Sequence, residues 1–217
     1  MPKNEKHTHK AALITLFAML TAISVVVGIL CKNLFTVAVY YRFTLENIGI
    51  IFAGIFFGPG AGALVGVAVD GISCLLSTNP AVNPVIMLGA LTVGVSSGVV
   101  AKYIVRERGL KQYIASAATA HLLGQVLIKS IGKMIYFGMP WFGIFIGLAC
   151  SILACAAEVA IIRTLMKNTE IRKFLFRLTG EKCVGVHRYD LQRSIGIYSF
   201  RNVDGKPSRA VPHYGVV

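Results

Sequence analysis

Charged residues are scarce in this sequence. Only 14% of its 217 residues are Asp, Glu, Lys or Arg, whereas an ordinary soluble domain carries about 25%. Hydrophobic residues make up 55% of the chain, and its mean hydropathy is +0.69. This composition excludes an ordinary soluble domain. It predicts an all-α integral membrane protein, because several apolar runs are long enough to form spanning helices.

Acidic residues are the rarest charged residues, with nine Asp and Glu against 22 Lys and Arg and a net charge of +13. A strongly basic chain can indicate a nucleic-acid-binding protein. Here, however, eleven Lys and Arg lie from Arg163 onward, and nearly all the others flank apolar segments. That distribution is the one that sets membrane topology. No nucleic-acid partner is therefore expected.

Several catalytic and metal-binding motifs are also missing. The five cysteines form no C-x-x-C pair and have no His spacing suited to zinc, so we interpret them as buried thiols. No G-x-x-x-x-G-K-[ST] motif occurs, and the chain therefore cannot use ATP through a P-loop of its own. We expect no metal, no cofactor and no enzymatic activity.

One catalytic motif is matched formally, between Gly94 and Gly98. The run Gly-Val-Ser-Ser-Gly fits the nucleophile elbow G-x-S-x-G, and His121 is a conceivable base. The elbow requires a strand, a turn and a helix, whereas this run lies inside an apolar segment. Small residues four apart are typical of close helix packing in membranes. An intramembrane serine hydrolase is kept only as an alternative.

The apolar residues fall into six segments, which predict a six-transmembrane-helix bundle. The first follows Lys3, Lys6 and Lys10 like a signal peptide, but it is long enough to span and no Ala-x-Ala cleavage site follows. Two segments are shorter than a straight span needs, and short spans tend to line a protected cavity. The six segments are residues 11–30, 45–57, 61–76, 85–104, 113–135 and 141–166.

The basic residues orient this bundle. With the amino terminus inside, 18 of the 22 Lys and Arg lie on the cytoplasmic side, as the positive-inside rule requires. Both termini are therefore predicted to be cytoplasmic. We divide the chain into a cytoplasmic amino terminus (1–10), the transmembrane substrate-binding domain (11–170) and a flexible, basic cytoplasmic tail (171–217).

Four polar residues predict an inward-facing stripe on the fifth segment. His121, Gln125, Lys129 and Lys133 follow one another at intervals of four, so they share one face of an α-helix. The two lysines could instead extend to the outer headgroups. His121 and Gln125 are too short for that and need an interior partner, which favours a polar face inside the bundle.

Several motifs together resemble one family, the substrate-binding S components of energy-coupling-factor (ECF) vitamin transporters, and most of all its folate-specific branch. The resemblance covers about residues 10 to 170. The motifs are Ala18-x-x-x-Ala22, Arg42 ahead of Glu46, Ala53-Gly54-x-x-Phe57-Gly58-Pro59, Gly62-x-x-x-Gly66-x-x-x-Asp70, Asn83-Pro84 with Leu88-Gly89-Ala90-Leu91, and the Gly94/Gly98 pair.

The resemblance implies a function and a set of partners. A six-helix bundle in a bacterial cell membrane would hold one vitamin near its outer end, under the loops after the first and third segments. It would dock onto a membrane coupling protein that carries two cytoplasmic ATPases, and Ala18 and Ala22 would form the docking strip. The expected function is high-affinity vitamin binding for uptake, with ATP hydrolysis supplied by the partner subunits.

Folate fits the charges of the expected site. Its glutamate tail is dianionic and can be met by Arg42, Lys129 or Lys133. S components for other vitamins, such as thiamine or riboflavin, are the alternative, and for a cationic or neutral vitamin we would expect more acidic or aromatic lining. A small channel would need repeated rings of charge or carbonyls, which the sequence lacks.

The pterin ring of folate presents donors, acceptors and an aromatic face. Asp70 and Asn83 are the predicted hydrogen-bonding partners, with Gln125 on the same polar stripe as the lysines. Tyr40 and Tyr136 are the predicted aromatic cover.

Overall fold

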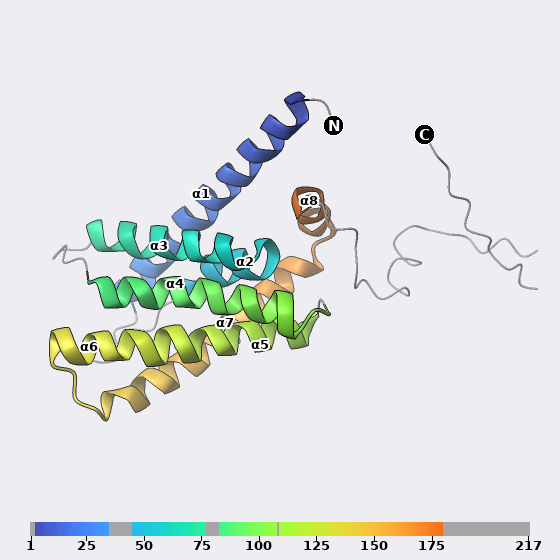
Figure 1. Ribbon diagram of the computed structural model, residues 1–217. Helices are drawn as coiled ribbons and strands as arrows, with labels where there is room; N and C mark the ends of the chain where they lie inside the picture. The colour runs from blue at the N-terminus through green and yellow to red at the C-terminus, as the bar shows by residue number, and fades with distance from the viewer. Residues whose placement is uncertain (1–2, 35–44, 77–82, 108, 180–217) are drawn as a thin grey trace, which may run out of the picture. The chain divides into compact units, whose positions relative to one another are not determined.

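The computed structural model describes residues 3–34, 45–76, 83–107 and 109–179, and all of its regular elements in these ranges are helices (Figure 1). The elements in chain order are α1 (Lys3–Leu34), α2 (Asn47–Phe57), α3 (Pro59–Leu75), α4 (Pro84–Val99), the π-helix η1 (Val100–Ile104), α5 (Leu110–Ala120), the π-helix η2 (His121–Ile128), α6 (Lys129–Phe137), α7 (Gly143–Lys167) and α8 (Thr169–Thr179). Apart from one or two terminal residues, each of the six apolar segments therefore lies in a helix or in a continuous helical rod.

Four of these rods are long and apolar enough to cross a membrane. They cover Ala11–Cys31, Pro84–Ile104, Leu110–Phe137 and Gly143–Lys167. The other two apolar helices, α2 and α3, have 11 and 17 residues. The protein is thus an all-helical membrane protein, and the six-span count remains a prediction that depends on these two short helices.

The shorter of these two helices, α2, lies at the centre of the bundle. Nine of its 11 residues are buried, and Ile50, Ile51 and Ala53 have no exposed surface. It packs against α1, α3, α4, α5 and α7. A helix that is apolar on every side must be enclosed by other elements, and α2 is.

The break between α2 and α3 falls where the sequence predicted it. Gly58 has a φ of 92°, a backbone conformation that favours glycine, and Pro59 is the first residue of α3. Proline is well suited to that position because it lacks the N–H that would be left without a partner there. A single residue therefore turns the chain from the core helix into its neighbour.

Glycines bring α4 into close contact with α2 and α3. A Cβ on Gly66 would lie 2.5 Å from the Ala90 carbonyl oxygen, and one on Gly98 would lie 2.5 Å from the Pro59 nitrogen. A Cβ on Gly94 would collide with the Gly62 backbone. Gly94 and Gly98 thus have the packing role that the sequence predicted.

The serines between those two glycines serve the helix itself. Ser96 Oγ donates to the Thr92 carbonyl at 2.6 Å, and Ser97 Oγ donates to the Gly94 carbonyl at 3.0 Å. Both lie within α4, without the strand and turn of a nucleophile elbow.

A further helix, α8, follows the last apolar rod. The sequence placed the start of a flexible tail at residue 171, whereas the structure continues as helix to Thr179. Leu175 and Leu178 are buried in it, and Phe174 is half exposed. Their one-sided burial explains why this short, strongly charged segment is helical. Residues 180–217 of the expected tail lie outside the described residues.

Candidate substrate-binding site

The central helix α2 begins inside the bundle, below the level at which the neighbouring helices α1 and α6 end. Its first turn is preceded by Glu46, which lies beside Gly28 of α1, six residues before the end of that helix. The partner of Glu46 is Lys129, eight residues before the end of α6. The polar start of α2 therefore lies about two turns inside the ends of α1 and α6.

Glu46 and Lys129 form a buried ion pair. Lys129 Nζ donates to Glu46 Oε1 at 3.4 Å, and the two side chains are 5% and 11% exposed. The pair joins the residue before α2 to the first residue of α6, 83 positions later in the chain. An unpaired ammonium group would be costly in a membrane-embedded bundle, so the carboxylate accounts for the inward position of Lys129.

Two glycines make room for this pair. A Cβ on Gly89 of α4 would lie 2.5 Å from Lys129 Cγ, and one on Gly28 of α1 would lie 2.9 Å from Glu46 Cβ. Any larger residue at either position would have to displace the lysine or the glutamate. The two glycines thus fix where the two charges lie.

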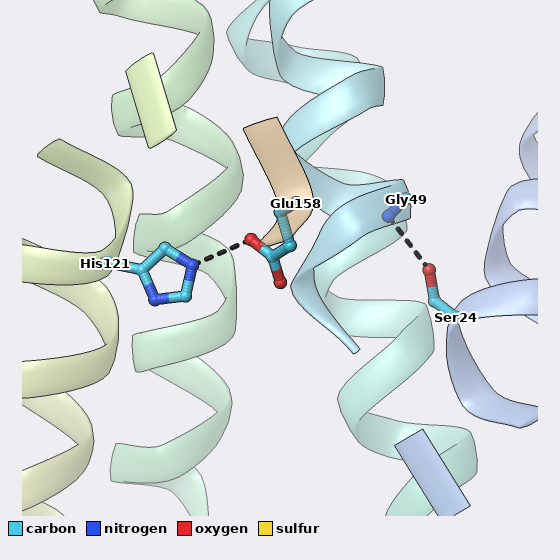
Figure 2. Close-up of polar contacts among 4 residues, drawn as sticks. All are labelled: Ser24, Gly49, His121 and Glu158. Atoms are coloured by element: carbon cyan, nitrogen blue, oxygen red, sulfur yellow. Dashed lines mark hydrogen bonds and ion pairs between the residues drawn. The ribbon is translucent and has the colours of Figure 1, made fainter. Parts of the chain in front are cut away.

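A second buried pair lies further from the end of the bundle at which α1 and α6 finish. His121 Nε2 and Glu158 Oε2 are 2.7 Å apart, with side chains 4% and 0% exposed (Figure 2). His121 opens the π-helix η2, and Glu158 belongs to α7. The prediction that His121 needs an interior partner is confirmed. Glu158 was not predicted as that partner, although it is the only acidic residue in the apolar segment 141–166.

Polar groups also meet α2 from its other side. The Gly49 N–H donates to Ser24 Oγ of α1 at 3.1 Å. Figure 2 shows Ser24 and Glu158 on different sides of the helix turn that carries Gly49. Since a Cβ on Gly49 would collide with that hydroxyl, α1 can approach α2 this closely only at a glycine.

Some buried polar atoms have no hydrogen-bond partner within the described part of the chain. Buried polar groups in proteins are nearly always satisfied, often by an ordered water molecule. The atoms belong to Glu46 and to residues of α2, α3, α5, η2 and α7, which places polar groups through much of the bundle. They include both ends of the Asn47 amide, Ser116 Oγ, His121 Nδ1, Gln125 Oε1 and Glu158 Oε1.

The predicted polar stripe is present, with a change in helical geometry. His121 and Lys129 are buried, Gln125 and Lys133 are half-buried, and the rod is π-helical from His121 to Ile128. Each π-helical turn takes one more residue than an α-turn and is frequently found at functional sites. No sequence pattern predicted this widening.

The other predicted site residues fall into three groups. Asp70 is half-buried near the end of α3, and Tyr136 is 53% exposed near the end of α6. Asn83 is the N-cap of α4, and its Oδ1 accepts from the N–H groups of Val85 and Ile86. Tyr40 and Arg42 lie outside the described residues.

The two alanines of the predicted docking strip, Ala18 and Ala22, are both exposed on α1. They lie among exposed apolar residues such as Ile14, Met19 and Val26. This face of α1 is therefore not used to pack the helix against its own bundle.

The described residues form a bundle of apolar helices with a buried lysine at the start of α6. The family model for the ECF transporter substrate-specific component matches residues 12–145. The chain belongs to this family. No curated protein matches the chain. This S component is thus the substrate-binding subunit of a transporter and not an enzyme, and it works with the partner subunits of an ECF module.

Proposed function

We propose that this S component binds a vitamin that carries carboxylates, with folate as the best candidate. The observation that carries the proposal is the burial of Lys129, which is 4% exposed, pairs with Glu46 and fits inside the bundle because residue 89 is a glycine. Buried cations in membrane helices commonly mark substrate pathways. A charge-assisted bond to a substrate carboxylate is the simplest use for such a group.

In this proposal, the substrate lies above the start of α2. Because α2 begins about two turns inside the bundle, its first turn forms the floor of the site. One glutamate carboxylate of folate pairs with Lys129 in competition with Glu46, whose bond to the lysine is long at 3.4 Å. Arg42 and Lys133 are the proposed partners of the second carboxylate.

The pterin ring is assigned to the remaining predicted residues. Asp70 and Gln125 offer hydrogen-bond acceptors from α3 and η2, and the Asn83 amide lies at the start of α4. Tyr40 and Tyr136 are proposed to cover the aromatic face of the ring. The oxygen of Asn83 already caps α4, so its amide nitrogen is the group assigned to the ligand.

Transport requires partner subunits in addition to this chain. We propose that Ala18 and Ala22 on the exposed face of α1 meet a helix of the coupling protein, and that two ATPase subunits supply ATP hydrolysis. The bundle would cross a bacterial plasma membrane six times, with α2 and α3 as short spans and both termini in the cytoplasm.

Calorimetric titration of the purified protein tests the substrate class. Folate and its reduced forms are expected to bind tightly, while thiamine and riboflavin give no heat of binding. Clear binding of thiamine or riboflavin, with none of folate, would assign the protein to another vitamin branch.

A further inference from the structure

The proposed substrate site does not explain how the net charge of the buried His121–Glu158 pair is neutralised. Glu158 is fully buried in α7, and its one hydrogen bond within the described residues is to His121. An ionised carboxylate beside a neutral imidazole would leave a net negative charge inside a membrane protein. That arrangement is strongly unfavourable. One proton shared by the two side chains removes the net charge.

Other charged groups lie near this pair, but together they do not neutralise its net charge. Glu46, just before α2, and Lys129 of α6 both act electrostatically on Glu158, but they carry opposite charges and are paired with each other. Cys155, one turn earlier on α7, is a further titratable group near the carboxylate. The sequence of α4 contains no titratable residue.

The unused polar atoms of the pair show where a proton can be exchanged. His121 Nδ1 and Glu158 Oε1 are buried and have no hydrogen-bond partner within the described residues, and the same is true of Ser116 Oγ, five residues before His121. Such atoms recruit ordered water. A water molecule at either atom provides a donor and an acceptor through which a proton can move.

We propose that His121 and Glu158 form a proton-binding site inside the bundle, and that its proton is thermodynamically coupled to an anion bound at Lys129. The first half stands on the geometry of the pair. The second half rests on the proposed binding of a carboxylate at Lys129, which begins α6 directly after the π-helix that His121 opens, so that both sites lie on one continuous rod.

The sign of the coupling follows from the charges. A substrate carboxylate beside Lys129 brings negative charge toward Glu158 and favours the protonated form of the pair. By reciprocity, the protonated pair favours the bound substrate. Substrate binding should therefore take up protons, and the affinity should fall as rising pH removes the proton from the pair.

The ligand-free protein tests the site itself. Infrared difference spectra between about pH 5 and about pH 9, a range that brackets histidine titration, should show a carboxyl signal that Glu158→Gln removes. Glu158→Gln keeps an oxygen that can accept from His121, so the fold should survive. Glu170→Gln, in the exposed Glu170–Lys173 pair of α8, is the matched control and should keep the signal. Identical difference spectra for wild type and Glu158→Gln would overturn the proposal.

Calorimetry tests the coupling in the wild-type protein. Folate binding, measured in buffers of different ionisation enthalpy, should show net proton uptake. The affinity at about pH 8 should be at least about fivefold weaker than at about pH 6, the lower end of typical coupling. Glu158→Gln should reduce this dependence to what the ligand's own titration produces. Folate binding without proton uptake would refute the coupling. A complete lack of folate binding would refute the proposed substrate, while the infrared result would still decide on the proton site.

Discussion

The two buried polar pairs of this bundle differ in length and in position. Glu46 and Lys129 are 3.4 Å apart, near the end of the bundle at which α1 and α6 finish. His121 and Glu158 are 2.7 Å apart, further inside. The first pair joins the residue before α2 to the first residue of α6, and it fits between Gly28 and Gly89. The second joins two long rods.

These differences suit the pairs to different tasks. A long bond near the helix ends can be exchanged for a bond to a substrate carboxylate. A short bond between fully buried groups is strong and costly to break, because either partner alone would be left without a hydrogen bond. The protein thus combines a pair that can exchange its partner with a pair that remains intact while its proton changes.

Breaking the inner pair should have the largest effect. His121→Leu leaves the Glu158 carboxyl group buried without its hydrogen bond, and removing one partner of a buried pair typically costs about 3–5 kcal/mol. We expect a markedly lower melting temperature in detergent. His121→Gln keeps a donor and should lose much less. Equal melting of His121→Leu and the wild-type protein would show that this pair contributes little to stability.

Filling the space beside the outer pair should have an intermediate effect. Gly89→Ala places a methyl group against Lys129 Cγ, and overpacking of this kind typically costs about 1–3 kcal/mol. The displaced lysine should also weaken folate binding. Gly71→Ala on α3 is the matched control, because nothing lies within 4 Å of its added Cβ. An unchanged folate affinity in Gly89→Ala would separate the lysine from the ligand.

Changing the exposed face of α1 should have the smallest effect on the bundle. Ala18→Trp adds bulk where the side chain is exposed, so the melting temperature and the folate affinity should stay close to wild type. Uptake by cells that contain the coupling protein and ATPases should be lost, because the bulky ring blocks close approach of a second helix. Co-purification of the complex and the melting temperature, measured on this one variant, provide the check. A variant that loses stability and ligand binding together would reject the docking role.

Sequence reasoning was most successful where local chemistry determines the structure. The break at Gly58-Pro59 and the tight packing at Gly94 and Gly98 follow from residue types alone, and the structure has both. The inward position of His121 was also predicted, because an imidazole is too short to reach the membrane surface.

The pairings themselves could not be predicted. Glu46 meets Lys129 across 83 positions and His121 meets Glu158 across 37, and one sequence does not reveal which distant helices are neighbours. The π-helix at residues 121–128 was missed because it has no hydrophobic period of its own. The helix at 169–179 was missed because its basic residues suggested a solvated tail.

The most direct test of the account is a double-mutant cycle on Lys129. Folate and a folate analogue with both glutamate carboxylates converted to amides are titrated into the wild-type protein and into Lys129→Met, with Lys32→Met as the control cation. We expect the diamide to bind wild type more weakly than folate, and the part of that difference that belongs to Lys129 is about 1.5–3 kcal/mol, the contribution of a hydrogen bond to a charged group. Lys129→Met should remove that part and leave the part that belongs to Arg42 and Lys133. Lys32 belongs to α1 and has no role in the proposed site, so Lys32→Met should preserve the whole difference. A difference that persists in full in Lys129→Met would contradict the account, because Lys129 would then not be the group that binds the substrate carboxylate.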